Sequence, residues 1–202
     1  MGATFSSPPS AAPAAILPPR GMSSPALVIC GPDAHAAYLF ADESTPLGTL
    51  STDLWSLDIP TGNWSLLNPT SPVSEGHSKG PRRLTCLDNI LYAALADGTF
   101  AEFEIDEGTW SSPSQPPSTL SCAVPVILDS SVGFIGAEGP SEQIDVTQFF
   151  NPANGSWIMG QPYPHAVNRA GSAVIGSTAY MFGGFGGRDF YGDLNKLDSP
   201  DG

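Results

Sequence analysis

The sequence predicts an all-β protein in which a four-stranded antiparallel unit recurs about four times. Three observations carry this prediction: 22 Gly and 21 Pro among 202 residues, tryptophans that recur at a nearly constant spacing, and short apolar runs that come in pairs. Gly and Pro at this frequency are unfavourable inside helices and typical of turns. The composition therefore favours many short strands joined by turns over a helical bundle.

The repeat is clearest at Trp64, Trp110 and Trp157, which are separated by 46 and 47 residues. Each tryptophan closes a similar stretch: LDIPTGNW, FEIDEGTW and FNPANGSW. Seven positions before each tryptophan stands an apolar residue, and between them lie Pro, Asp, Asn and Gly, the residues of a tight turn between two strands. Each stretch is therefore expected to hold the last two strands of one unit.

A pair of apolar runs precedes each stretch and is expected to form the first two strands of the unit. The pairs are 27–30 with 37–40, 84–87 with 90–95, 124–128 with 132–135, and 173–175 with 179–182. A fourth unit follows because DLNKLD (193–198) matches DLWSLD (53–58), which would place its tryptophan at position 204. The units are expected at about 25–68, 82–112, 120–160 and 168–202, after a disordered Pro/Ala/Ser-rich leader at 1–24.

Four short antiparallel strands in a unit of about 40 to 50 residues are typical of a β-propeller blade. The copy RAGSAVI (169–175), AYMFGG (179–184) and DL (193–194) resembles the kelch repeat, in which a hydrophobic strand ends in a Gly pair. The resemblance covers about residues 25–202, although the Gly pair is intact only at Gly183-Gly184. It implies a kelch-like β-propeller of about four blades, the last incomplete, cut as an arc from a larger propeller. A generic β-sandwich is the alternative fold.

The repeated residues are expected to serve packing rather than chemistry. The expected packing residues are Trp64, Trp110, Trp157, Tyr38, Tyr92 and Tyr180. The tryptophans would bury flat surface between adjacent blades. Gly183 and Gly184 would let a strand leave the crowded axis with a positive φ.

Charge and hydropathy exclude two classes of partner. Twenty acidic against seven basic residues give a net charge of −13, which would repel a phosphate backbone, so nucleic acid is not expected. The longest apolar stretch, 90–96, is far shorter than the roughly 20 residues of a membrane span. Without a recognisable signal peptide the location is taken as cytoplasmic by default, with secretion as the alternative.

No metal, cofactor or catalytic set can be assigned. Cys30, Cys86 and Cys122 are widely spaced and are expected as small buried apolar residues, with one disulfide and one free thiol as the alternative in an exported chain. The histidines, His35, His77 and His165, are expected as ordinary surface residues. Kelch-containing copper oxidases that act on sugars need a Cys–Tyr pair and two His ligands, and no such set is assignable.

Function is therefore expected on the surface, as a non-catalytic module that binds a protein partner. Connections between the second and third strands and between blades emerge on one face, here 42–51, 68–81, 113–120, 138–143, 161–169 and 185–191. The candidate binding residues are Arg82, Arg83, Arg169, Phe185, Arg188, Phe190 and Tyr191, of types enriched at interfaces. Alternatively, Phe190 and Tyr191 pack under their loop as part of the third strand.

Three further expectations concern the chain as a whole. Asn63 and Asn154 begin Asn-x-Ser sequons in exposed turns and would accept glycans in a secreted protein. Apolar faces on the end blades predict self-association. The alternative functions are a glycan-binding or sugar-oxidising extracellular kelch protein, or a truncated gene product without an independent role.

Overall fold

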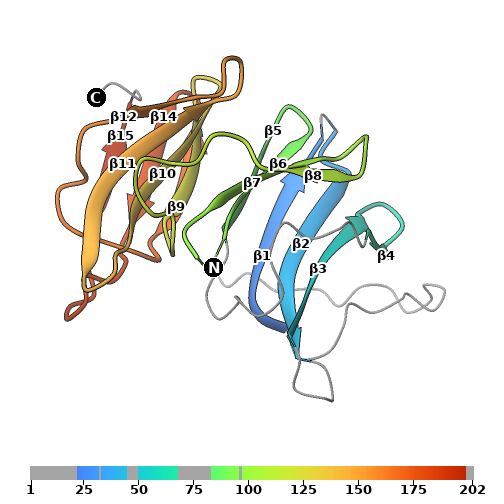
Figure 1. The fold of residues 1–202 in the computed structure, drawn as a ribbon, viewed down its shortest axis with the longest axis horizontal. Helices are drawn as coiled ribbons and strands as arrows, with labels where there is room; N and C mark the ends of the chain where they lie inside the picture. Colours follow the sequence, from blue (N-terminus) through green and yellow to red (C-terminus); the bar gives the residue numbers. More distant parts are fainter. Residues whose placement is uncertain (1–21, 32, 45–49, 68–82, 96, 199–202) are drawn as a thin grey trace, which may run out of the picture.

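A computed structural model describes residues 22–31, 33–44, 50–67, 83–95 and 97–198. These residues form four antiparallel sheets, three with four strands and one with three (Figure 1). In each sheet the strands follow one another in chain order. No helix long and apolar enough to cross a bilayer is found in this part of the chain.

Each sheet is one unit of the predicted repeat. The first holds β1 (Met22–Cys30), β2 (Ala36–Ser44), β3 (Leu50–Asp58) and β4 (Asn63–Leu66). The second holds β5 (Arg83–Leu87), β6 (Ile90–Ala94), β7 (Phe100–Glu104) and β8 (Thr109–Ser111). The third holds β9 (Val124–Leu128), β10 (Ser131–Glu138), β11 (Gln143–Asn151) and β12 (Ser156–Met159). The fourth holds β13 (Gly171–Ile175), β14 (Thr178–Phe182) and β15 (Leu194–Leu197).

The turn between the third and fourth strands has the same form in three sheets. Gly62, Gly108 and Gly155, each two residues before a repeat tryptophan, take φ values of 72°, 67° and 67°. Their N–H groups donate to the carbonyls of Asp58, Glu104 and Asn151 at 2.8, 2.8 and 2.9 Å. Only glycine adopts this left-handed conformation without strain, so the glycine two before each tryptophan sets the hairpin.

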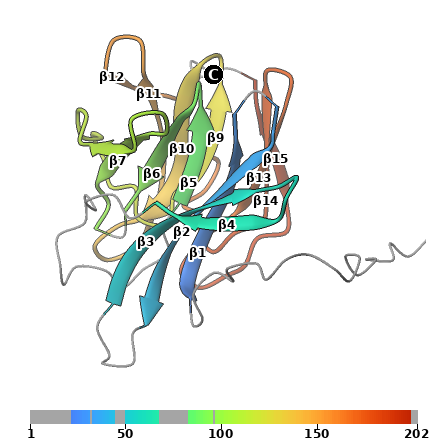
Figure 2. The ribbon, with the colours of Figure 1, turned by 90° about the vertical axis from the view of Figure 1, so that its right-hand side faces the viewer.

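The sheets are arranged as consecutive blades of a β-propeller. The first strand of each blade contacts the first strand of the next: β1 lies against β5, β5 against β9, and β9 against β13 (Figure 2). All five residues of β13 are exposed, and Leu27 and Ile29 of β1 are 61% and 57% exposed. In the described part of the chain the ring is therefore not closed between β13 and β1.

Each junction between adjacent blades contains one hydrophobic core. The first core includes Phe40 and Leu54 from the first blade with Leu91 and Phe103 from the second. The second core joins Tyr92 and Phe100 to Phe134 and Phe150. The third joins Val126 and Phe149 to Ala179 and Met181. Because every core takes residues from two blades, no blade buries its apolar surface alone.

The first strand starts earlier than the sequence predicts. The sequence places the leader at 1–24 and the first apolar run at Leu27. In the structure β1 already begins at Met22, which pairs with Glu43 of β2. The register of the β1–β2 pair shifts between Ser23 and Ala26, next to Pro25. Proline has no N–H for a ladder, so an irregularity is where a strand accommodates it. Residues 1–21 lie outside the described residues.

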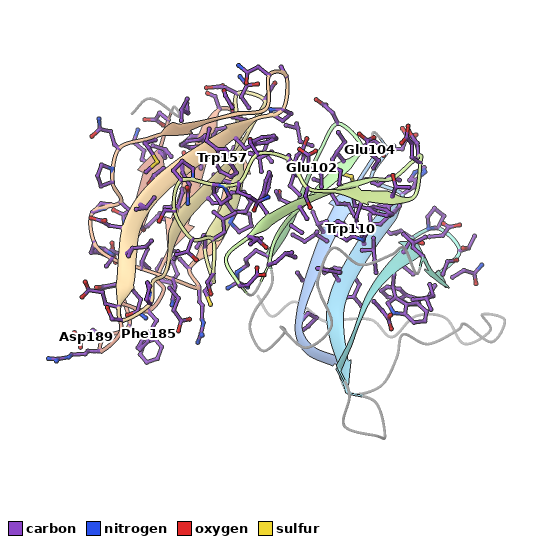
Figure 3. All side chains as sticks on the ribbon, in the orientation of Figure 1. Glu102, Glu104, Trp110, Trp157, Phe185 and Asp189 are labelled. Atoms are coloured by element: carbon purple, nitrogen blue, oxygen red, sulfur yellow. A yellow bond between two sulfur atoms is a disulfide. The ribbon has the colours of Figure 1, made fainter. Side chains whose placement is uncertain are left out.

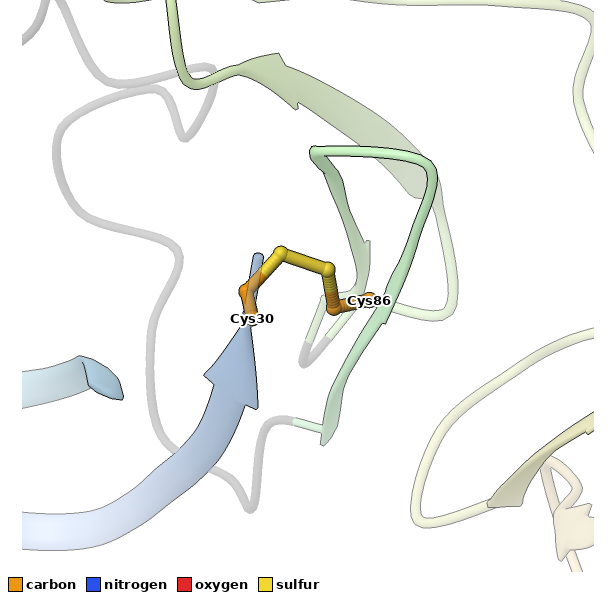
Figure 4. Close-up of a disulfide and its surroundings, with 2 residues drawn as sticks. All are labelled: Cys30 and Cys86. Atoms are coloured by element: carbon orange, nitrogen blue, oxygen red, sulfur yellow. A yellow bond between two sulfur atoms is a disulfide. The ribbon is translucent and has the colours of Figure 1, made fainter. Parts of the chain in front are cut away.

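Two of the cysteines form a disulfide, so the prediction that all three cysteines are unpaired, small apolar residues is wrong for Cys30 and Cys86. Cys30 at the end of β1 is bonded to Cys86 in β5, with 5.7 Å between their Cα atoms (Figure 4). The contact between β1 and β5, the first strands of the first two blades, brings these residues together across 56 positions of sequence. Cys122 is a buried free thiol.

Candidate functional site

Backbone hydrogen bonds join the loops of one end of the blades into a continuous surface, here called the loop face. Leu120 N–H donates to the Gly98 carbonyl at 3.1 Å, and Glu138 N–H donates to the Ser121 carbonyl at 2.7 Å. Asn168 and Phe185 exchange two bonds, at 3.0 and 2.9 Å. Arg169 N–H also donates to the Cys122 carbonyl at 3.1 Å, which links the loops of the third and fourth blades. The predicted segments 113–120, 138–143, 161–169 and 185–191 thus lie in or next to this network, whereas 68–81 and, within 42–51, residues 45–49 lie outside the described residues.

The segment 185–191 forms a small hairpin at this end of the fourth blade. Phe185 bridges both Asn168 and Phe190, and Gly186 N–H donates to the Asp189 carbonyl at 2.9 Å. The rings of Phe185 and Phe190 lie 5.1 Å apart between centroids. Figure 3 shows Phe185 and Asp189 at the opposite end of the molecule from Glu104, which lies beside a turn between third and fourth strands.

Phe190 and Tyr191 take opposite directions: Phe190 is exposed, and Tyr191 packs under the loop. The Phe190 side chain is 83% exposed. Tyr191 lies beneath the hairpin, where a Cβ added to Gly186 would come within 3 Å of its ring. Its ring also lies 3.9 Å from that of His165. Neither residue belongs to the third strand, because β15 begins only at Leu194.

Four of the seven candidate binding residues line one pocket. Its volume is about 400 Å³, and its walls are Arg169, Phe182, Gly183, Gly184, Phe185, Phe190 and Tyr191. Gly183 and Gly184 have φ values of 70° and 105°, and a Cβ on Gly184 would lie 2.4 Å from Val167 Cγ2. The glycine pair therefore lets the end of β14 pass tightly under the connection that carries Arg169.

Arg169 is held at the pocket edge by the third blade. Its Nη2 atom lies 3.3 Å from Glu138 Oε2 and 3.8 Å from the Cys122 sulfur. The thiol in turn donates to Glu138 Oε2 at 3.2 Å. Burial, reinforced by the bond to Glu138, raises the pKa of Cys122, which leaves it a neutral thiol and a poor nucleophile at neutral pH.

The remaining candidates are dispersed. Arg188 is exposed at the hairpin tip and does not line the pocket. Arg83 lies half-buried in β5, where burial lowers its pKa, although a guanidinium stays charged at neutral pH. Arg82 and His77 lie outside the described residues. Asn63 is the exposed first residue of β4, and Asn154 is exposed in the turn before β12. Asn154 Oδ1 accepts bonds from the N–H and hydroxyl of Ser156.

Two of the repeat tryptophans, Trp110 and Trp157, lie where adjacent blades meet. Trp110 contacts Phe40 of the preceding blade, and Trp157 contacts Phe100 of the blade before it. Trp64 is half-buried in β4, on a blade that has no predecessor in the described residues. Tyr38 and Tyr92 are buried, and Tyr180 is half-buried on the fourth blade.

His165 takes part in a polar group that sequence reasoning missed. The half-buried imidazole lies 3.6 Å from the Asp193 carboxylate and packs between Tyr163 and Tyr191. Asn195 donates to the Tyr163 hydroxyl at 2.9 Å and also to Asp193, and its bond lowers the Asp193 pKa. No sequence signal joins these residues, because they come from two loops and a strand. His35 is exposed, as expected.

These observations define the class of protein: the described part of the chain is a β-propeller whose loops at one end are joined by backbone hydrogen bonds. A scan against protein-family models finds no match to the sequence. A search of curated proteins likewise finds no relative. Among the described residues, no group of three or more His, Cys, Asp and Glu side chains is placed to hold a metal ion.

Proposed function

We propose that this chain is a kelch-type, non-catalytic binding module whose loop face recognises a protein partner around Phe190. The observation that supports this proposal is the exposed Phe190 ring, fixed on Phe185 at the rim of the pocket that Arg169 lines. Aromatic and arginine side chains are enriched among residues that dominate binding energy. The rigid blade beneath reduces the ordering cost on association.

The charge distribution suggests the chemistry of the partner segment. The whole chain carries a net charge of −13, yet the hairpin presents Arg188 beside the exposed Phe190. A segment with an apolar or aromatic anchor and a neighbouring carboxylate would match these two groups. The anchor would enter the pocket of about 400 Å³, and the carboxylate would approach a guanidinium.

A displayed peptide library tests the proposal without a named partner. Selection on the full chain, with counter-selection on a Phe190→Ser variant, is expected to enrich peptides that pair an aromatic residue with Asp or Glu. Arg188→Glu should weaken the selected peptides by about tenfold, and Leu66→Ser, at another exposed apolar position, should not change them. Equal recovery on wild type and Phe190→Ser would overturn the proposal.

A second candidate function, glycan binding outside the cell, is favoured by the Cys30–Cys86 disulfide. Disulfides persist in oxidising compartments, and an exposed aromatic ring offers a flat apolar face to a sugar. A glycan array probed with the wild type and Phe190→Ser distinguishes the two functions. Binding of sugars that is lost in Phe190→Ser, with no enriched peptide, would favour the glycan.

A further inference from the structure

A second pocket lies between the third and fourth blades, beside β15 and apart from the loop-face pocket. Its volume is about 340 Å³. Its apolar part is formed by Ile135 from the third blade and by Met181 and Leu197 from the fourth, with Thr147 and Tyr163 completing the wall. Gln161, Pro162, Pro164, Asn195, Lys196 and Asp198 form the rest of the lining.

The same place at the preceding junction is filled by an indole. Trp157 lies 5.3 Å from Phe150 and 6.3 Å from Phe134 of its own blade, and 5.0 Å from Phe100 of the blade before. Trp110 occupies the corresponding place one junction earlier, 5.2 Å from both Phe40 and Phe103. A repeat tryptophan is thus held by two adjacent blades.

Strand register relates these neighbours to the pocket walls. Leu197, opposite Ala179 in the fourth blade, corresponds to Phe150, opposite Val132 in the third. By the same alignment Met181 corresponds to Phe134 and Thr147 to Phe100. The three residues that surround the Trp157 ring therefore have counterparts that all line this pocket.

The residue that accepts the hydrogen bond of the Trp157 indole N–H also has a counterpart at this pocket. Trp157 Nε1–H donates to the Ser114 carbonyl at 2.8 Å, and Ser114 stands four residues after Trp110. The residue four after Trp157 is Gln161, which lines the pocket. A tryptophan placed here would find apolar walls and, at the corresponding position, a backbone acceptor.

The strand beside the pocket has a free edge. In the other three blades the third strand pairs with a fourth that carries the tryptophan, as β11 does with β12. β15 pairs with β14 and is the edge strand of its sheet in the described part of the chain (Figure 1). An unpaired edge of this kind accepts an added strand through backbone hydrogen bonds.

We propose that β15 and this pocket together bind an extended peptide strand that carries a tryptophan. The strand would pair with Leu194–Leu197 and place its indole between Thr147, Met181 and Leu197. None of the four tryptophans of these 202 residues is available to fill the pocket, because Trp55, Trp64, Trp110 and Trp157 belong to strands that are already paired. This pocket shares no lining residue with the loop-face pocket, although Gln161 to Pro164 belong to the loop-face segment 161–169.

The chain's own fourth-strand sequence provides the probe. A labelled peptide NGSWIMG, identical to residues 154–160, is titrated into the full chain and followed by fluorescence anisotropy. Saturable binding is expected, and a NGSAIMG peptide should bind at least about tenfold more weakly because it lacks the indole. Saturating peptide should also raise the melting temperature of the chain.

Variants of the wall locate the binding. Leu197→Arg and Leu197→Trp, which charge or fill the pocket, should each abolish peptide binding, whereas Leu66→Arg, Leu66→Trp and Phe190→Ser should leave it unchanged. Circular dichroism confirms that each variant is folded, and the peptide pair tests the indole in wild-type protein. Equal affinity for the two peptides, or no saturable binding, would overturn the proposal. A dimer that Leu197→Arg dissociates would show that a second copy of this chain occupies the site, and would overturn the proposal. Peptide binding seen only after deletion of residues 1–21 would show that these residues of the same chain occupy it, and would overturn the proposal as well.

Discussion

The indole of Trp157 in β12 lies edge-to-face against the ring of Phe100 in β7, with 5.0 Å between the centroids. The contact crosses the junction between the third and second blades, and Trp110 makes a corresponding contact with Phe40 at the junction before, at 5.2 Å. The tryptophan of a blade therefore packs backward onto the blade that precedes it. This direction makes adjacent blades depend on each other for stability.

Removing the Trp157 side chain should destabilise the protein strongly. Trp157→Ala is expected to lower the free energy of unfolding by about 3 to 5 kcal/mol, because contacts with three phenylalanines and a hydrogen bond to Ser114 are lost. Trp64→Ala should cost less, since the first blade has no preceding blade in the described residues. Urea unfolding measures both variants. Wild-type stability in Trp157→Ala would contradict the packing role.

Gly184→Ala should be more costly than the same change in a hairpin turn. The added methyl group would meet Val167 Cγ2 at 2.4 Å and the Asn168 carbonyl oxygen at 2.9 Å, on a backbone with φ of 105°. Strain and overpacking together predict a loss of about 3 kcal/mol. Gly62→Ala, with φ of 72° and open space around the new Cβ, serves as control and should lose about 1 kcal/mol. Equal losses in the two variants would show that the close approach is unimportant.

Breaking the Cys30–Cys86 disulfide should lower stability by about 4 kcal/mol, from the loop entropy of a 56-residue separation. The Cys30→Ser/Cys86→Ser double variant and the reduced wild type should unfold at similar urea concentrations. Reductant should leave the double variant unchanged. A wild type whose unfolding is insensitive to reductant would argue that β1 and β5 are held by packing alone.

Glu102 should make the protein less stable as pH rises through its titration. Burial in β7, with Glu104 nearby, raises the Glu102 pKa above its unfolded value, although Ser111 partly offsets this shift. A carboxyl with a raised folded pKa destabilises the fold once it ionises, so stability is fully present below the unfolded pKa and falls above it. Glu102→Gln should therefore gain less than about 1 kcal/mol at neutral pH, and nothing below the unfolded pKa. A gain that persists at low pH would point to another cause.

The blades could be predicted from sequence because each repeats a local chemical pattern. The stretch from Leu57 to Trp64 contains its own turn glycine, Gly62, and the hairpin forms through a bond to Asp58 only four residues away. Turn residues and alternating apolar residues act at short range, so their spacing reveals the unit. The apolar runs gave strand positions but not the start of β1, which continues past Pro25 through an irregular register.

The pairing of the cysteines and the split of the hairpin aromatics depended on three-dimensional neighbours. Cys86 is reached by Cys30 only because β5 packs against β1. Phe190 and Tyr191 are adjacent in sequence, yet only Tyr191 packs against His165, which comes from another loop. Contacts between segments far apart in the chain leave no periodic signal in the sequence.

The disulfide also fixes how the molecule would yield to a mechanical pull on its two ends. Between Cys30 and Cys86 the chain is bypassed by a covalent bond, so tension runs directly from β1 to β5 and the intervening strands bear none of it. Extension would then come from the part of the second blade that follows Cys86 and from the third and fourth blades, where only non-covalent contacts hold the strands. A single-molecule force trace should therefore lengthen by the excluded 56 residues only after reduction.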